Sequence, residues 1–209
     1  MDFTLPPEVE ALRLQVRRFV EDELLPLEAT PGFLDAHENI AEPALAILRA
    51  KAKAAGLWAF QMPVERGGRG LSHVGMAALY EEAARSPFGP VVFNAAPPDD
   101  GNMQVLNKVL KTEALKQRWL QPIIDGRVRS AFAMTEPQGC GSDPSLTYTR
   151  AEKIGDKWRI TGRKWFITGA EGAQTFILIA RTAPPGTGGD DRKSLTAFLV
   201  GMAQEDGLL

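Results

Sequence analysis

Two short segments carry the residues best suited to hold a ligand. In residues 130–143 an apolar run breaks at Glu136-Pro137 into a loop that contains glycines and ends in Ser142-Asp143. In residues 162–169 two aromatic residues precede a threonine and a glycine. Successive backbone N–H groups of a glycine-containing loop bind phosphate oxygens, and aromatic side chains offer a flat apolar surface. The two segments together suit a flat ring system that carries phosphates.

The glycine spacing in the first segment loosely imitates a dinucleotide-binding turn. Gly139, Gly141 and Ser145 approach the pattern G-x-G-x-x-G, which works only where a helix follows and its N-terminus holds the pyrophosphate. Here Pro144 and the strand-like residues 146–149 follow, so a Rossmann site is excluded. Two interpretations stay open: a phosphate loop that uses N–H groups and a hydroxyl, or an ordinary β-loop with glycines at tight turns.

Hydroxyl, aromatic and acidic side chains add candidates. Thr135 and Thr168 each end an apolar strand, where side chains either face a ligand or bond the nearby backbone. Trp165 and Phe166 are adjacent, so in a strand they point to opposite faces, and which of them faces a ligand stays open. Glu136 is a possible general base, but a glutamate before proline at a strand end more often organises a loop.

Composition excludes several classes of protein. The 209 residues are 44% hydrophobic and 24% charged. The formal net charge is −2, and the arginines and lysines are scattered rather than clustered, which argues against nucleic acid as a partner. A single cysteine, Cys140, excludes an intrachain disulfide, and with only His37 and His73 no zinc site is readable. We expect no metal site, no membrane span and, from the acidic start of the chain, a cytoplasmic location.

The first half of the chain predicts helices. Apolar residues recur at helical spacing after Pro6-Pro7 and again around Leu48, and Ser72 is a plausible N-cap for a helix that runs through Arg85. Residues 103–110 and 113–124 complete the helical part.

After Arg129 the pattern changes to strands rich in aromatic and β-branched residues, with Gly155-Asp156 as a hairpin turn. The predicted strands cover residues 131–134, 147–152, 158–161, 164–168, 176–180 and 195–200. We therefore predict an α+β protein, with an all-α domain over residues 1–128 and an antiparallel, β-barrel-like domain over residues 129–209.

Taken together, the motifs resemble the acyl-CoA dehydrogenase family. Members carry a T-E-P loop ending in G-S-D, here residues 135–143, and then a G-x-K-x-aromatic-I-T segment, here residues 162–168. Residues 94–106 look most like the branch that includes the kinase-associated acyl-CoA dehydrogenases and their bacterial relatives. The resemblance runs from Phe3 to about Val200.

The resemblance implies noncovalently bound FAD. Residues 132–135 would lie along the flavin ring, Phe166 would pack on it, and Thr168 would hydrogen-bond near N5, which would assign Trp165 to the core. Gly141 and Ser142 would contact the pyrophosphate, and Ser142 would also lie near the CoA thioester arm. The implied cofactor-binding residues are Phe132, Met134, Thr135, Gly141, Ser142, Phe166, Ile167 and Thr168.

The resemblance also implies a substrate and partners. The family removes the α-proton and the β-hydride of an acyl-CoA thioester, passes electrons to an electron-transferring flavoprotein and forms homo-oligomers. Its C-terminal four-helix bundle, with the glutamate base, would be absent here, so no catalytic residue is assigned to the 209 residues.

Three hypotheses follow from that resemblance. The first, which we favour, is a truncated acyl-CoA dehydrogenase chain that is inactive alone. The second is a self-sufficient short flavoprotein in which Glu136 or a partner chain supplies the base. The third is a non-catalytic flavin- or partner-binding module that needs a complementary C-terminal chain.

Overall fold

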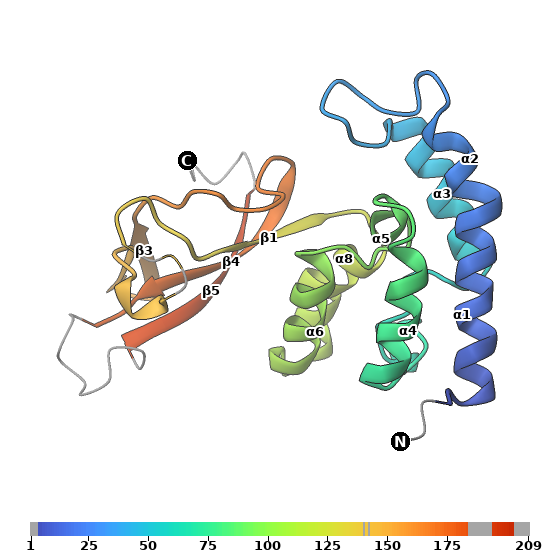
Figure 1. The fold of residues 1–209 in the computed structure, drawn as a ribbon. Helices are drawn as coiled ribbons and strands as arrows, with labels where there is room; N and C mark the ends of the chain where they lie inside the picture. Colours follow the sequence, from blue (N-terminus) through green and yellow to red (C-terminus); the bar gives the residue numbers. More distant parts are fainter. Residues whose placement is uncertain (1–3, 140, 142, 184–193, 203–209) are drawn as a thin grey trace. The chain divides into compact units, whose positions relative to one another are not determined.

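A computed structural model describes residues 4–139, 141, 143–183 and 194–202. The chain divides into two units, residues 1–100 and residues 101–209. The first is built of helices, and the second combines helices with a sheet (Figure 1). Within the described ranges, no helix is long and apolar enough to cross a membrane.

The first unit is organised by two long helices that pack side by side, α1 (Pro7–Phe19) and α4 (His73–Ala83) (Figure 1). The predicted N-cap of α4 is confirmed, because the Ser72 hydroxyl accepts a hydrogen bond of 3.1 Å from the Gly75 amide. α1 runs on through a π-helical turn, Val20–Leu24, into α2 (Leu25–Glu28). The remaining helical elements are α3 (Glu42–Ala54), a 3₁₀ turn (Val64–Arg66) and α5 (Gly89–Val92).

One apolar core holds the first unit together. Aromatic rings meet edge to face within it; the Phe19 and Phe93 centroids lie 5.1 Å apart. The predicted helical stripes supply much of the core, as Val16 and Leu48 are fully buried. Other members of this core are Val20, Leu24, Leu57, Phe60, Leu79, Ala83 and Val92.

The second unit begins with helices that lead into the sheet. The predicted helix over residues 113–124 is confirmed: α7 (Glu113–Leu115), a π-helical turn (Lys116–Leu120) and α8 (Gln121–Ile124) follow one another directly. It is preceded by α6 (Asp99–Val109), and a 3₁₀ turn (Pro144–Leu146) lies among the strands. The strands are β1 (Arg129–Ala133), β2 (Arg150–Ile154), β3 (Lys157–Thr161), β4 (Ala173–Arg181) and β5 (Leu195–Gly201).

The sheet is mixed, so the predicted antiparallel arrangement is wrong. β2 and β3 form the predicted hairpin, and β4 pairs with β5 antiparallel, but β1 runs parallel to β4. Phe176 of β4 pairs with Ala131 on one side and Val200 on the other, so β4 is central. The segment from β1 to β4 includes a whole hairpin and is long enough for a parallel crossover. Strand periodicity does not reveal that direction.

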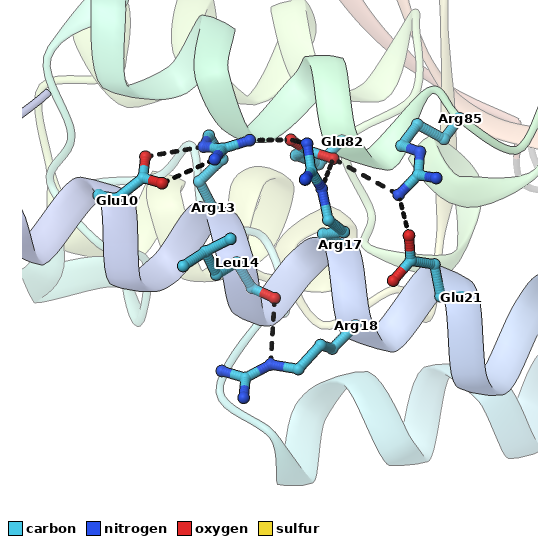
Figure 2. Close-up of polar contacts among 8 residues, drawn as sticks. All are labelled: Glu10, Arg13, Leu14, Arg17, Arg18, Glu21, Glu82 and Arg85. Carbon is cyan, nitrogen blue, oxygen red and sulfur yellow. Dashed lines mark hydrogen bonds and ion pairs between the residues drawn. The ribbon is translucent and has the colours of Figure 1, made fainter. Parts of the chain in front are cut away.

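An ionic network joins α1 to α4 at the edge of the helical core. Figure 2 shows Arg13 and Arg17 of α1 reaching the carboxylate of Glu82 on α4. The two Arg17–Glu82 bonds are 2.8 and 2.7 Å, and the Glu82 side chain is almost fully buried. Glu10 and Glu21 bind Arg13 and Arg85, so the charges balance within the network. The buried carboxylate is stabilised because cations and hydrogen bonds replace its hydration.

Removing the charge of Glu82 should weaken the first unit. We expect Glu82→Gln to lower the free energy of unfolding by about 2–3 kcal/mol, because charge-assisted bonds to two arginines are lost. Denaturant unfolding followed by circular dichroism measures this. Glu81→Gln, next to it on the exposed face of α4, is the matched control and should change stability little. Equal stability of both variants would contradict the role of the network.

The contribution of Glu82 should also depend on pH. Although burial opposes it, hydrogen bonding to Arg17, followed by the charges of Arg17 and Arg13, holds the pKa of Glu82 below its ordinary value of 4.5. The stabilisation is therefore complete above pH 4.5 and is lost as pH falls through the lower pKa of the folded state. The difference in unfolding free energy between the wild type and Glu82→Gln, measured from neutral to acid pH, should shrink only in that acid range.

Candidate functional site

The two chemistry-bearing segments lie against each other in the second unit. The Trp165 amide donates a hydrogen bond of 3.1 Å to the Thr135 carbonyl, just beyond the end of β1. One residue away on each segment, the Lys164 ammonium donates a bond of 2.8 Å to the Met134 carbonyl. These two links hold residues 134–135 beside residues 164–165, although about thirty positions separate them in the chain.

β1 presents one of its predicted site residues outward. Ala131 and Ala133 are buried, and Phe132 between them is 38% exposed, as the alternation of a strand requires. Met134 and Thr135 follow at the strand end and are partly buried. The end of β1 therefore offers a mixed apolar and hydroxyl-bearing edge.

Residues 164–168 form a corner, so the predicted strand there is wrong. Phe166 has a φ of 51°, a left-handed conformation that costs a bulky residue about 1–2 kcal/mol and ends any extended run. Trp165 and Phe166 therefore do not point to opposite faces. Their rings stack with centroids 4.5 Å apart at 32°.

The corner is exposed. Trp165 is 42% exposed and Phe166 is 82% exposed, so the assignment of Trp165 to the core is also wrong. Phe166, Ile167 and Thr168 share the lining of one hollow of about 550 Å³ with Lys164, Trp165 and Ala170. Three of the predicted cofactor-binding residues thus meet at one place, and Thr135 is bonded to its rim through Trp165.

Glu136 fastens a third segment to this corner. Its buried carboxylate accepts hydrogen bonds from the Tyr148 amide at 2.6 Å, the Thr149 amide at 2.9 Å and the Lys164 ammonium at 2.7 Å. Both carboxylate oxygens are engaged by the protein itself. This arrangement supports the interpretation that Glu136 organises the loop rather than acting as a base.

The protonation of Glu136 agrees with that role. Burial raises the pKa of the carboxyl, but hydrogen bonds from Lys164, Thr149 and Tyr148 outweigh it, and the pKa lies below its usual range. A general base that works near neutral pH needs the opposite shift. Glu136 is therefore a stable anion in the fold.

The loop after Glu136 is described in part. Gly141 is exposed, and apart from its chain neighbours no atom lies within 4 Å of the place where a Cβ would stand. Ser142 and Cys140 lie outside the described residues, and the predicted contacts of Ser142 stay predictions. Farther on, the Asp143 carboxylate accepts a bond of 2.9 Å from the Ser145 amide.

Two cations were missed from the sequence. The buried Arg181 guanidinium, at the end of β4, donates hydrogen bonds to the carbonyls of Ser145 at 2.5 Å and Thr147 at 3.2 Å. These bonds hold residues 145–147 against the end of β4. Lys164 links Glu136 to Met134. In both cases the sequence shows a charged residue next to an apolar run. That pattern does not predict which distant carbonyls or carboxylate the cation will bind.

A larger, mostly apolar hollow of about 940 Å³ also lies on the second unit. Trp119, Trp158 and Phe198 contribute rings to its lining, and Lys164 borders it as well as the aromatic corner. Within the described ranges, no three His, Cys, Asp or Glu side chains gather where they could hold a metal ion.

Comparison with known proteins identifies the family. The description "Acyl-CoA dehydrogenase, N-terminal domain" matches residues 6–127, and "Acyl-CoA dehydrogenase, middle domain" matches residues 131–208. The chain belongs to the acyl-CoA dehydrogenase family. The resemblance seen in its motifs is thereby confirmed, while the predicted domain boundary at residues 128/129 stays a prediction.

Individual relatives agree with the family. The chain is 38% identical over 175 residues to "Acyl-CoA dehydrogenase family member 10" of Mus musculus. This match covers 79% of this chain and 16% of the mouse protein. A solved structure from Mycobacterium abscessus assigned to the acyl-CoA dehydrogenases is 34% identical, with a TM-score of 0.85 over 96% of this chain and 51% of that one.

A third comparison extends the fold to a flavin complex. A glutaryl-CoA dehydrogenase from Mycobacterium smegmatis, solved in complex with FADH2, has a TM-score of 0.68 at 22% identity and covers 94% of this chain and 46% of that one. At this identity the likeness shows the fold alone. The chain spans about half the length of both matched structures.

The packing of Gly162 gives a test of the site's architecture. A Cβ at this position would lie 2.2 Å from the Thr149 hydroxyl and 2.8 Å from Thr149 Cα. We expect Gly162→Ala to push Thr149 away from Glu136 and to destabilise the second unit by about 1–3 kcal/mol.

Denaturant unfolding of Gly162→Ala measures this loss. Gly101→Ala is the control, because Gly101 lies in α6 and, apart from its chain neighbours and the backbone of its own helix, no atom lies within 4 Å of its Cβ position. That change should leave stability equal or slightly higher, since alanine favours a helix. A Gly162→Ala variant as stable as Gly101→Ala would contradict the close packing.

Proposed function

We propose that this chain forms the flavin-binding part of an FAD-dependent acyl-CoA dehydrogenase. The observation that carries the proposal is the joint between the end of β1 and the aromatic corner, where the Trp165 amide bonds the Thr135 carbonyl and Phe166 stands 82% exposed. A large exposed aromatic ring held in a strained conformation is a costly arrangement unless it meets a ligand. The family supports FAD as that ligand.

The residues present fit a flavin. An outward Phe132 and an exposed Phe166 offer apolar contact to a flat ring, and the Thr135 and Thr168 hydroxyls offer hydrogen bonds at its edge. Met134 and Ile167 complete that surface. We assign the pyrophosphate to Gly141 and Ser142, and the CoA thioester arm to Ser142, on the strength of the family motif.

The substrate class is an acyl-CoA thioester. Bound FAD would accept the β-hydrogen as hydride while a base removes the α-proton. This chain's part in that reaction is to orient the ring, exclude water with its aromatic corner and offer hydrogen bonds at the ring edge. Glu136 is engaged by three donors, so we place the base in the family's C-terminal region, outside these 209 residues.

The family also supports the partners of the complete enzyme. We propose an electron-transferring flavoprotein as the electron acceptor, assembly of the complete enzyme as a homo-oligomer, a role in fatty acid β-oxidation and a cytoplasmic location.

Titration of the chain with FAD tests the proposed flavin site. We expect amide NMR shifts to concentrate in residues 132–135 and 166–169, and Phe166→Ala to weaken binding about fivefold, equivalent to about 1 kcal/mol of lost ring stacking. Ile154→Ala removes an exposed apolar side chain from the β2–β3 hairpin and should leave the affinity unchanged. Shifts confined to other residues, or no binding at millimolar FAD, would refute the site.

The same sample tests the location of the base. Adding acyl-CoA to the chain and FAD without oxygen should leave the yellow colour of the flavin unbleached. Bleaching that Glu136→Gln abolishes would instead assign the base to Glu136 and establish a self-sufficient short flavoprotein. FAD binding without bleaching, restored to turnover by an added C-terminal segment, would agree with the proposal.

A further inference from the structure

Lys164 and Glu136 form a buried ion pair at the centre of the candidate site. The side chains are 11% and 3% exposed, and Lys164 Nζ lies 2.7 Å from the Glu136 carboxylate. The ammonium also donates to the Met134 carbonyl at 2.8 Å. Burying both charges is unfavourable unless each is fully hydrogen-bonded, so the pair fixes the geometry of every group it touches.

The pair collects three stretches of chain. The Glu136 carboxylate accepts hydrogen bonds from the amides of Tyr148 and Thr149, while the Lys164 ammonium donates to the Met134 carbonyl, one residue after the end of β1. The Trp165 amide, next in the chain to Lys164, is directed at the Thr135 carbonyl, next to Glu136. Residues 134–136, 148–149 and 164–165 are therefore tied at one point.

The Phe166 ring stacks on Trp165, but the corner that the two residues form is exposed. Phe166 has a φ of 51° and an 82% exposed ring, so burial does not impose its strained backbone. The anchors lie immediately before it, at the Lys164 side chain and the Trp165 amide. Strain of this kind persists only where the surroundings over-determine the conformation.

We propose that Lys164 and Glu136 are positioning residues that hold the Phe166 corner at a fixed distance from the end of β1. Their role is to keep Phe166 and the Thr135 and Thr168 hydroxyls in one arrangement for a flat ring. The inference rests on the proposed flavin site, but the tie among the three segments belongs to the chain itself and is measurable without flavin.

Two readouts test the pair in Lys164→Met, which keeps the length of the side chain and removes its charge. The first is the hydrogen-exchange rate of the Trp165 amide without FAD, which should rise at least about tenfold when the charge-assisted bonds are lost. The second is the affinity for FAD, measured together with the shape of the visible absorption band of the bound flavin. Binding should weaken about tenfold or more, and the band should revert toward that of free FAD.

Two further variants separate positioning from a general loss of stability. Arg159→Met breaks the Arg159–Glu152 ion pair of the β2–β3 hairpin, which is exposed on both sides, and should change neither readout. The double variant Glu136→Gln with Lys164→Met should bind FAD no worse than Lys164→Met alone, because the two side chains act as a unit. Additive losses would overturn the pairing.

Each outcome decides a different statement. Wild-type affinity and unchanged Trp165 exchange in Lys164→Met would overturn the positioning role. If the wild type binds no FAD, the proposed function fails, and the Trp165 exchange rate alone decides whether the pair holds the corner. If Lys164→Met does not fold, Glu136→Gln gives the same two measurements: faster exchange supports the proposal, and an unchanged rate contradicts it.

Discussion

The buried carboxylate of Glu136 is the interaction on which the candidate site depends. A carboxylate leaves water only when donors replace its hydration, and here two backbone amides and one ammonium do so. Those donors lie just outside two paired strands, since Tyr148 and Thr149 precede β2 and Lys164 follows β3. The hydrogen bonds of the buried carboxylate therefore hold together loop residues that lie outside the hydrogen-bonded strands.

The helical unit also contains a buried carboxylate that is stabilised by cations, but there it joins two helices. Glu82 joins α1 to α4 through arginines whose side chains stay partly in solvent, so the contact serves the packing of two helices. Glu136 is enclosed, and its cation is buried with it. One carboxylate fixes the register of helices around an apolar core; the other fixes loops around a site. The two roles differ in the exposure of the bound cation, because the arginines at Glu82 stay partly in solvent and Lys164 at Glu136 is buried.

Local signals in the sequence sufficed where local chemistry decides the structure. The Ser72 cap and the helix over residues 113–124 follow from side chains close in the chain, and the sequence motifs named the two segments that lie together in the candidate site. The direction of β1 against β4 and the turn at Phe166 depend on partners thirty or more positions away, so periodicity misjudged both. For the same reason Glu136 could be read as a loop organiser, but its donors could not be named.

Lys164 lines both the hollow at the aromatic corner and the larger apolar hollow. A substitution beside Lys164 in either hollow therefore changes the surroundings of a charge that both hollows share. Energies of changes in the two places will not simply add, because they have a neighbour in common. During divergence, residues beside Lys164 in one hollow therefore constrain which residues are tolerated beside it in the other.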